Sequence, residues 1–171
     1  MTICSHQRHL LFEDDSVKQV IGWAWKQIPI HFGFAETDAF DIMPNHLHGV
    51  IVIQPNSGSW SIVGAQHAGR LLSTTNRSSS ASTPAALSVI IRAFKAAVTR
   101  ELRLQNLWDD QPFWQRNYYD RVVRDNDELR SIREYIAQNP AAWEHDQENP
   151  ARATDERHSQ RWGWLENPRS S

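Results

Sequence analysis

Cysteine is almost absent from this 171-residue chain, and its scarcity excludes two kinds of site. Cys4 is the only cysteine, so the chain has no disulfide framework and no zinc site built from thiolates. No stretch approaches the roughly 20 apolar residues that a membrane-spanning helix needs. Residues 1–6 also lack the basic and then apolar plan of a signal peptide. We therefore expect a cytoplasmic protein without a membrane partner.

A strong net charge is also missing. The chain has 18 Lys and Arg against 20 Asp and Glu, a net charge of −2, which does not by itself indicate a nucleic-acid-binding protein. The near-neutral total conceals an uneven distribution, because residues 85–124 contain seven basic and four acidic side chains. We therefore expect a basic surface in the middle of the chain.

Hydrophobic periodicity predicts four strands and three helices in the order strand, helix, strand, strand, helix, strand, helix. The expected strands are 2–6, 32–43, 46–54 and 119–124, and the expected helices are 14–28, 83–104 and 125–139. Pro29 is expected to end the first helix, and residues 43–45 to form the tight turn of a hairpin. Asp125 and Glu128 have the spacing of a capping box at the start of the last helix.

This order of elements fits an α+β sandwich, in which an antiparallel sheet carries helices on its faces. The length suits a single domain, which we expect over residues 1–150. A Ser-rich insertion loop interrupts this domain at 55–84, and a polar C-terminal tail follows at 151–171.

Two histidines, His46 and His48, lie at the start of the third expected strand. Side chains in a strand alternate between faces, so both imidazoles are expected to point the same way. Two neighbouring imidazoles on a rigid strand can bind one divalent cation. The alternative for such a pair is that one histidine packs in the core while the other faces solvent.

Tyr135 and Asn139 are four residues apart on the last expected helix and therefore share a face. Simple alternatives exist, because Tyr135 can pack with its hydroxyl at the rim and Asn139 can be a plain helix C-cap. Together with the histidines, they favour phosphodiester chemistry. A tyrosine hydroxyl has a pKa of about 10, so it needs a nearby cation or base to act as a nucleophile. Two histidines and the amide oxygen of Asn139 form a ligand set that suits Mg²⁺ or Mn²⁺ and leaves positions open for a phosphate.

Three segments then resemble a known family in their order and spacing. Residues 43–49 (MPNHLHG) resemble the histidine-hydrophobic-histidine motif of HUH single-tyrosine transposases. Residues 113–120 (FWQRNYYD) and 135–140 (YIAQNP) resemble the later blocks of the REP-associated tyrosine transposases, a branch of that superfamily. The resemblance covers about residues 1–150.

This resemblance implies a ferredoxin-like fold with the histidine pair on a central strand. It implies that Tyr135 is the nucleophile, which forms a 5′-phosphotyrosine link and frees a 3′-hydroxyl. It also implies that His46 and His48 bind the metal and that Asn139 is the third ligand. Tyr119 ranks second for the nucleophile.

The expected substrate is single-stranded DNA next to a REP-like hairpin, and no nucleotide cofactor is needed. The enzyme is expected to act as a monomer or a homodimer. The basic block and the aromatic segment after it provide the expected DNA-binding residues, which are Arg92, Lys95, Arg116, Tyr119 and Arg121.

Two other functions remain open from the sequence. The chain can be a catalytically inactive protein that binds hairpin DNA or RNA and derives from such an enzyme. It can also be a metal-dependent phosphodiesterase that releases its product without protein attachment. The presence of the histidines, the tyrosine and the amide favours the transposase.

Overall fold

The computed structural model describes residues 1–54, 83–146 and 149–150. The Ser-rich insertion, except for its last two residues, and the C-terminal tail predicted from the sequence lie outside these residues. The elements are β1 (Thr2–Cys4), a 3₁₀ turn (His6–Arg8), α1 (Asp15–His31), β2 (Ala35–Ile42), β3 (His46–Ile53), α2 (Thr83–Leu104), α3 (Asn126–Gln138) and a second 3₁₀ segment, η2 (Asn139–His145). No helix in the described part of the chain is long and apolar enough to cross a membrane.

The strands form an antiparallel sheet in the order β1-β3-β2. Residues 113–119 run antiparallel along the other side of β1, where Thr2 donates its N–H to the Tyr119 carbonyl at 2.7 Å and His6 donates to Phe113 at 2.9 Å. Counting this segment, the sheet has the strand order of a ferredoxin-like α+β sandwich, which confirms the expected fold class.

The strand expected at 119–124 is wrong in its position. Bridges pair Ser5 with Trp114 and Thr2 with Tyr119, so the chain leaves the sheet where the expected strand was to begin. The Val122-Val123 pair suggested a strand there, but Val122 is 72% exposed. Two adjacent β-branched residues are therefore not sufficient for a strand when no neighbouring strand offers them an unpaired edge.

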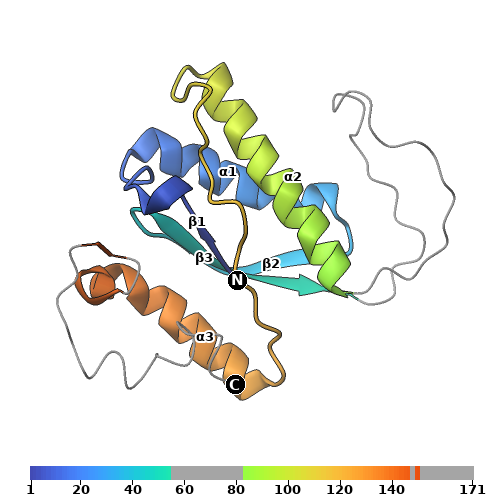
Figure 1. Ribbon diagram of the computed structural model, residues 1–171. Helices are drawn as coiled ribbons and strands as arrows, with labels where there is room; N and C mark the ends of the chain where they lie inside the picture. Colours follow the sequence, from blue (N-terminus) through green and yellow to red (C-terminus); the bar gives the residue numbers. More distant parts are fainter. Residues whose placement is uncertain (55–82, 147–148, 151–171) are drawn as a thin grey trace, which may run out of the picture.

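Helices cover both faces of the sheet (Figure 1). α1 and α2 pack together on one face, over the main hydrophobic core. α3 lies on the opposite face, where a smaller apolar cluster of Val50, Ile132, Tyr135 and Ile136 joins it to β3. The side chains of β3 point alternately to these two faces, and those of its even-numbered residues point toward α3.

α1 begins as the sequence predicts but ends later. The Asp14 carboxylate accepts the Ser16 N–H at 2.7 Å and caps the helix. Pro29 lies inside the helix, which continues to His31, and Phe32 donates its N–H to Ile28 at 2.8 Å. A proline this close to the end removes only its own N–H bond, so the prediction that Pro29 ends the helix is wrong.

The start of α3 depends on two carboxylates. Asp125 Oδ1 accepts the Glu128 N–H at 2.8 Å, which is the bond that an N-cap side chain makes. Glu128 does not return the bond to Asp125, because its carboxylate accepts from the Arg124 N–H at 2.8 Å and from Arg121 Nε at 2.8 Å. The N-cap prediction is therefore confirmed, whereas the reciprocal capping box is replaced by a bond to the preceding residue.

Gly49 allows a close approach between β3 and α1. A Cβ atom at this position would collide with the six-membered ring of Trp25. The Trp25 indole stacks on Phe40 of β2, with ring centroids 4.4 Å apart and an interplanar angle of 13°. The glycine that follows the histidine pair thus makes room for the largest side chain of the core.

Candidate metal centre

His46 and His48 project from β3 onto the face covered by α3. Their side chains share this face because two residues separate equivalent positions in a strand, and the turn at 43–45 places His46 at the strand's first position. His46 is 0% and His48 8% exposed, so the alternative with one solvent-facing histidine is wrong. The two Nε2 atoms lie 3.0 Å apart.

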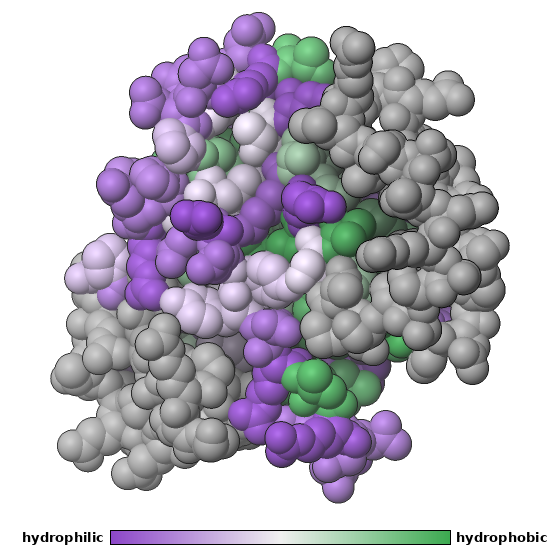
Figure 2. All heavy atoms as spheres, turned by 45° about the vertical axis from the view of Figure 1, so that its right-hand side comes forward, coloured by the Kyte–Doolittle hydropathy of each residue, from purple (hydrophilic) through white to green (hydrophobic). Residues whose placement is uncertain are grey.

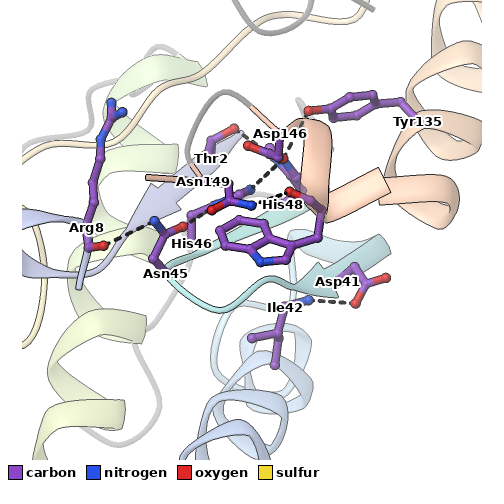
Figure 3. A network of polar contacts seen from close by, with 11 residues as sticks. Thr2, Arg8, Asp41, Ile42, Asn45, His46, His48, Tyr135, Asp146 and Asn149 are labelled. Atoms are coloured by element: carbon purple, nitrogen blue, oxygen red, sulfur yellow. Dashed lines mark hydrogen bonds and ion pairs between the residues drawn. The ribbon is translucent and has the colours of Figure 1, made fainter. Parts of the chain in front are cut away.

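The other nitrogen of each imidazole has a hydrogen-bond partner (Figure 3). His46 Nδ1 lies 2.9 Å from Asn45 Oδ1, and His48 Nδ1 lies 2.9 Å from Thr2 Oγ1 on the neighbouring strand β1. These contacts fix the orientation of both rings and turn both Nε2 atoms toward the same point. Such partners on the outer nitrogen are typical of histidines that bind metals.

Asp146 completes a group of three side chains that can hold a metal ion. The ligand atoms of His46, His48 and Asp146 all lie within 4.8 Å of one another, and all three residues are buried. Asp146 Oδ2 is 3.7 Å from His46 Nε2. Asp146 follows the 3₁₀ segment η2, whose Trp143 ring lies 6.0 Å from the His46 ring, centroid to centroid.

The sequence analysis missed Asp146. It lies in a polar stretch with several other acidic residues, and nothing in its spacing separates it from solvent-exposed carboxylates. The reversal that brings it over β3 depends on the η2 segment, which begins at the Asn139-Pro140 pair. The helix-stopping proline was therefore the only available signal that the chain turns here.

Burial keeps both imidazoles neutral at pH 7. Desolvation lowers the pKa of His46 to about 4, although the Asp146 carboxylate opposes the shift. Desolvation, and then the neighbouring His46, hold the pKa of His48 well below its usual value of 6.5. A histidine binds a metal through a neutral nitrogen, so the site is ready to bind one without first losing a proton.

Asn139 is the C-cap residue of α3 and is buried. Neither its side-chain nitrogen nor its oxygen has a hydrogen-bond partner among the described residues. A buried, unsatisfied amide costs about 1–3 kcal/mol and calls for an explanation. The C-cap position of Asn139 is confirmed, and the role of its side chain as a metal ligand stays a prediction.

Tyr135 meets the histidine pair from α3. Its hydroxyl is 3.4 Å from His48 Nε2, and the two ring centroids are 5.2 Å apart. The hydroxyl therefore lies beside the group that can hold a metal, not at the rim of the core (Figure 3). The one-turn spacing from Tyr135 to Asn139 follows from the helix, whereas the contact with His48 follows from the docking of α3 on β3.

A cleft of about 460 Å³ opens beside this cluster, between α3, the face of β3 that α3 covers and residues 119–126. His48 and Tyr135 line it, together with Tyr119 and Arg121. On the face of the molecule seen in Figure 2, apolar side chains are grouped in a hollow with hydrophilic ones around them. Tyr118 is engaged elsewhere, because its hydroxyl lies 3.0 Å from Ser88 Oγ of α2.

The other three predicted DNA-binding residues lie outside the cleft. Arg92 and Arg116 are exposed, on α2 and on the segment 113–119. Lys95 is partly buried and donates from Nζ to the carbonyls of Gln115 at 2.8 Å and Asn117 at 2.9 Å. Desolvation lowers the pKa of Lys95 to about 8. The structure thus gives Lys95 a structural role, because it ties α2 to the edge segment of the sheet.

Comparison with known proteins gives a relative without an assigned activity. The chain is 33% identical over 156 residues to an uncharacterized protein of Haemophilus influenzae, and the match covers 86% of this chain and 82% of the other. No family model matches the chain, and no solved structure matches it.

Proposed function

The chain belongs to the same family as the Haemophilus influenzae protein, and we propose that it is a metal-dependent transposase of the HUH single-tyrosine kind. It cleaves and rejoins single-stranded DNA next to hairpins through a 5′-phosphotyrosine intermediate. The observation that carries this proposal is the Tyr135 hydroxyl, which lies 3.4 Å from His48 Nε2, and His48 belongs to the group of three side chains that can hold a metal.

The donor set fits a divalent cation. Two imidazole Nε2 atoms and a carboxylate oxygen converge in a buried space, and the Asn139 amide provides a further unsatisfied oxygen. Imidazole and carboxylate together suit Mn²⁺ better than Mg²⁺, which prefers oxygen ligands and bound water. A divalent cation bound here supplies Lewis-acid polarisation of a phosphate oxygen.

Tyr135 provides the nucleophile. Its phenolic oxygen attacks phosphorus, so a bond from phosphorus to the tyrosine oxygen forms and the bond from phosphorus to the 3′-oxygen breaks. The tyrosine loses its hydroxyl proton, and the departing 3′-oxygen gains one. Rejoining is the reverse reaction, in which a 3′-hydroxyl attacks the phosphotyrosine. α3 holds the phenol in place through the apolar cluster with Val50 and Ile136.

The DNA strand enters by the cleft beside Tyr135. Tyr119 offers an exposed aromatic ring for base stacking there. Arg121 lines the same cleft, where its Nε donates to Glu128 at 2.8 Å.

A second, open groove of about 590 Å³ lies on α2, and its lining includes Arg100 and Arg103. Lys95 also lines it, but its ammonium is bonded to two carbonyls, and Arg103 is paired with Asp110 at 3.5 Å. We assign the hairpin to this basic side, with the single strand passing the edge formed by residues 113–119.

A covalent-adduct assay tests the proposal. The substrate is a pool of single-stranded DNA molecules, each with a hairpin, randomised flanking bases and a fluorophore at the 3′ end. Cleavage through a 5′-phosphotyrosine leaves the fluorophore on the protein in a denaturing gel. With Mn²⁺ we expect a labelled protein band from the wild type, at least 100-fold less from Tyr135→Phe, and an undiminished band from the control Tyr119→Phe.

The other outcomes identify the competing functions. An undiminished adduct in Tyr135→Phe contradicts the choice of nucleophile. Cleaved DNA without a labelled protein band indicates a metal-dependent phosphodiesterase. Hairpin binding with a steep salt dependence and no cleavage indicates an inactive DNA- or RNA-binding protein.

A further inference from the structure

We propose that Asn45 is a positioning residue that fixes the tautomer of His46 and so keeps the lone pair of its Nε2 available for a cation. The Thr2 hydroxyl orients His48 but does not choose its tautomer. This inference rests on the metal site of the proposed function. It does not depend on the DNA chemistry, and it can be tested without DNA.

Asn45 can act only as an acceptor toward His46. Its Nδ2 donates to the Arg8 carbonyl at 3.2 Å, and a carbonyl oxygen only accepts, so the amide orientation is determined. Oδ1 therefore faces His46 Nδ1, at 2.9 Å. An amide oxygen has no proton to give, so the imidazole must carry its proton on Nδ1. His46 Nε2 is left with a free lone pair.

No water competes for this bond, because Asn45 and His46 are both completely buried. A buried imidazole in the other tautomer would set two acceptors against each other at Asn45 Oδ1, which is costly in a site of low dielectric constant. The tautomer of His46 is therefore the same with and without a metal.

The environment of His48 is different. Its Nδ1 lies 2.9 Å from Thr2 Oγ1, and a hydroxyl can donate or accept. Its Nε2 lies 3.0 Å from His46 Nε2 and 3.4 Å from the Tyr135 hydroxyl, which can also donate or accept. Thr2 therefore orients the His48 ring without deciding which nitrogen carries the proton.

The His46 ring is therefore held in one tautomer by the contact on its outer nitrogen (Figure 3). Its Nδ1 donates to Asn45 Oδ1 at 2.9 Å, and its Nε2 faces His48 and Asp146, where a cation would bind.

Nuclear magnetic resonance of ¹⁵N-labelled protein at neutral pH tests the inference directly, because the two imidazole nitrogens differ in chemical shift. Comparison with His46→Gln and His48→Gln assigns the signals. We expect a proton on Nδ1 of His46 both in EDTA and after addition of Zn²⁺, a diamagnetic probe. A proton on Nε2 of His46 in EDTA would overturn the inference.

Variants with matched controls measure the consequence for affinity. Asn45→Leu has a similar shape but no acceptor, and we expect Mn²⁺ affinity by calorimetry to fall about 10- to 100-fold, as for other partners of metal-bound histidines. Asn45→Asp retains the acceptor toward His46 but sets its second oxygen against the Arg8 carbonyl, so we expect it to lower stability while His46 keeps its proton on Nδ1. Thr2→Val should lose affinity, whereas Thr2→Ser should not.

The two proposals fail in different ways. If Asn45→Leu and Thr2→Val bind Mn²⁺ like the wild type, the positioning role is contradicted. If either variant does not fold, the tautomer of His46 in the wild type still decides. If this tautomer is as expected and no DNA adduct forms, the proposed function fails and the inference stands.

Discussion

Arg133 of α3 and Asp38 of β2 form an ion pair through two donor nitrogens, on the face of the sheet that carries His46 and His48. Arg133 Nη2 donates to Asp38 Oδ2 at 2.6 Å, and Nε donates to the same oxygen at 3.0 Å. Arg133 lies two residues before Tyr135, and the apolar cluster beneath α3 is small. The pair therefore helps to set the position of α3, and with it the Tyr135 hydroxyl.

Reversing one charge of this pair should loosen α3. We expect Asp38→Arg to increase amide hydrogen exchange in α3 and to reduce adduct formation several-fold, with α1 and α2 unchanged. The swap Asp38→Arg with Arg133→Asp restores opposite charges and is the control. Equal exchange in the single and the double variant would mean that the ion pair does not hold the helix.

Gly49→Ala should destabilise the fold. The added Cβ collides with Trp25, and overpacking of a core typically costs about 1–3 kcal/mol. Denaturant unfolding measures this loss, and Trp25→Phe in the same chain should recover part of it. Gly22→Ala is the matched control, because a Cβ there meets nothing within 4 Å. An alanine inside α1 should instead raise stability by about 0.5–1 kcal/mol.

The stability of the metal-free protein should fall between pH 6.5 and about pH 4. His46 has a pKa of about 4 in the folded protein and of about 6.5 when unfolded. As the pH falls through this window, the unfolded chain binds a proton that the folded protein excludes, so the free energy of unfolding decreases. One such group contributes on the order of 3 kcal/mol. Denaturant unfolding in EDTA across this range measures the effect. If the free energy of unfolding of the wild type changes with pH in the same way as that of His46→Gln, then His46 is not buried as a neutral group.

Lys95 and Arg92 should respond differently to the loss of charge. Lys95→Met removes the bonds to Gln115 and Asn117, and we expect a loss of about 1–3 kcal/mol in the free energy of unfolding. Arg92→Met should leave stability unchanged and weaken hairpin binding, with a reduction of about 1 in the slope of log affinity against log salt. An unchanged salt slope in Arg92→Met would remove Arg92 from the DNA surface.

Local patterns predicted much of the fold. The helical stripes, the Asp14 and Asp125 caps and the hairpin turn all depend on residues within a few positions of one another, which is why the sequence indicates them directly. The edge segment was misplaced because pairing with β1 is a long-range relationship. Asp146 was missed for the same reason, since a carboxylate becomes a candidate ligand only through the path of the chain that precedes it.

The sequence by itself determined that His46 and His48 point the same way, because a strand repeats every two residues, and that Tyr135 and Asn139 share a helical face. It also indicated an α+β sandwich. Only the tertiary structure decided that α3 lies on the histidine face, that Asp146 joins the site and that Lys95 is used within the protein. The physical reason is that these features depend on which surfaces bury each other, and burial is a property of the assembled layers.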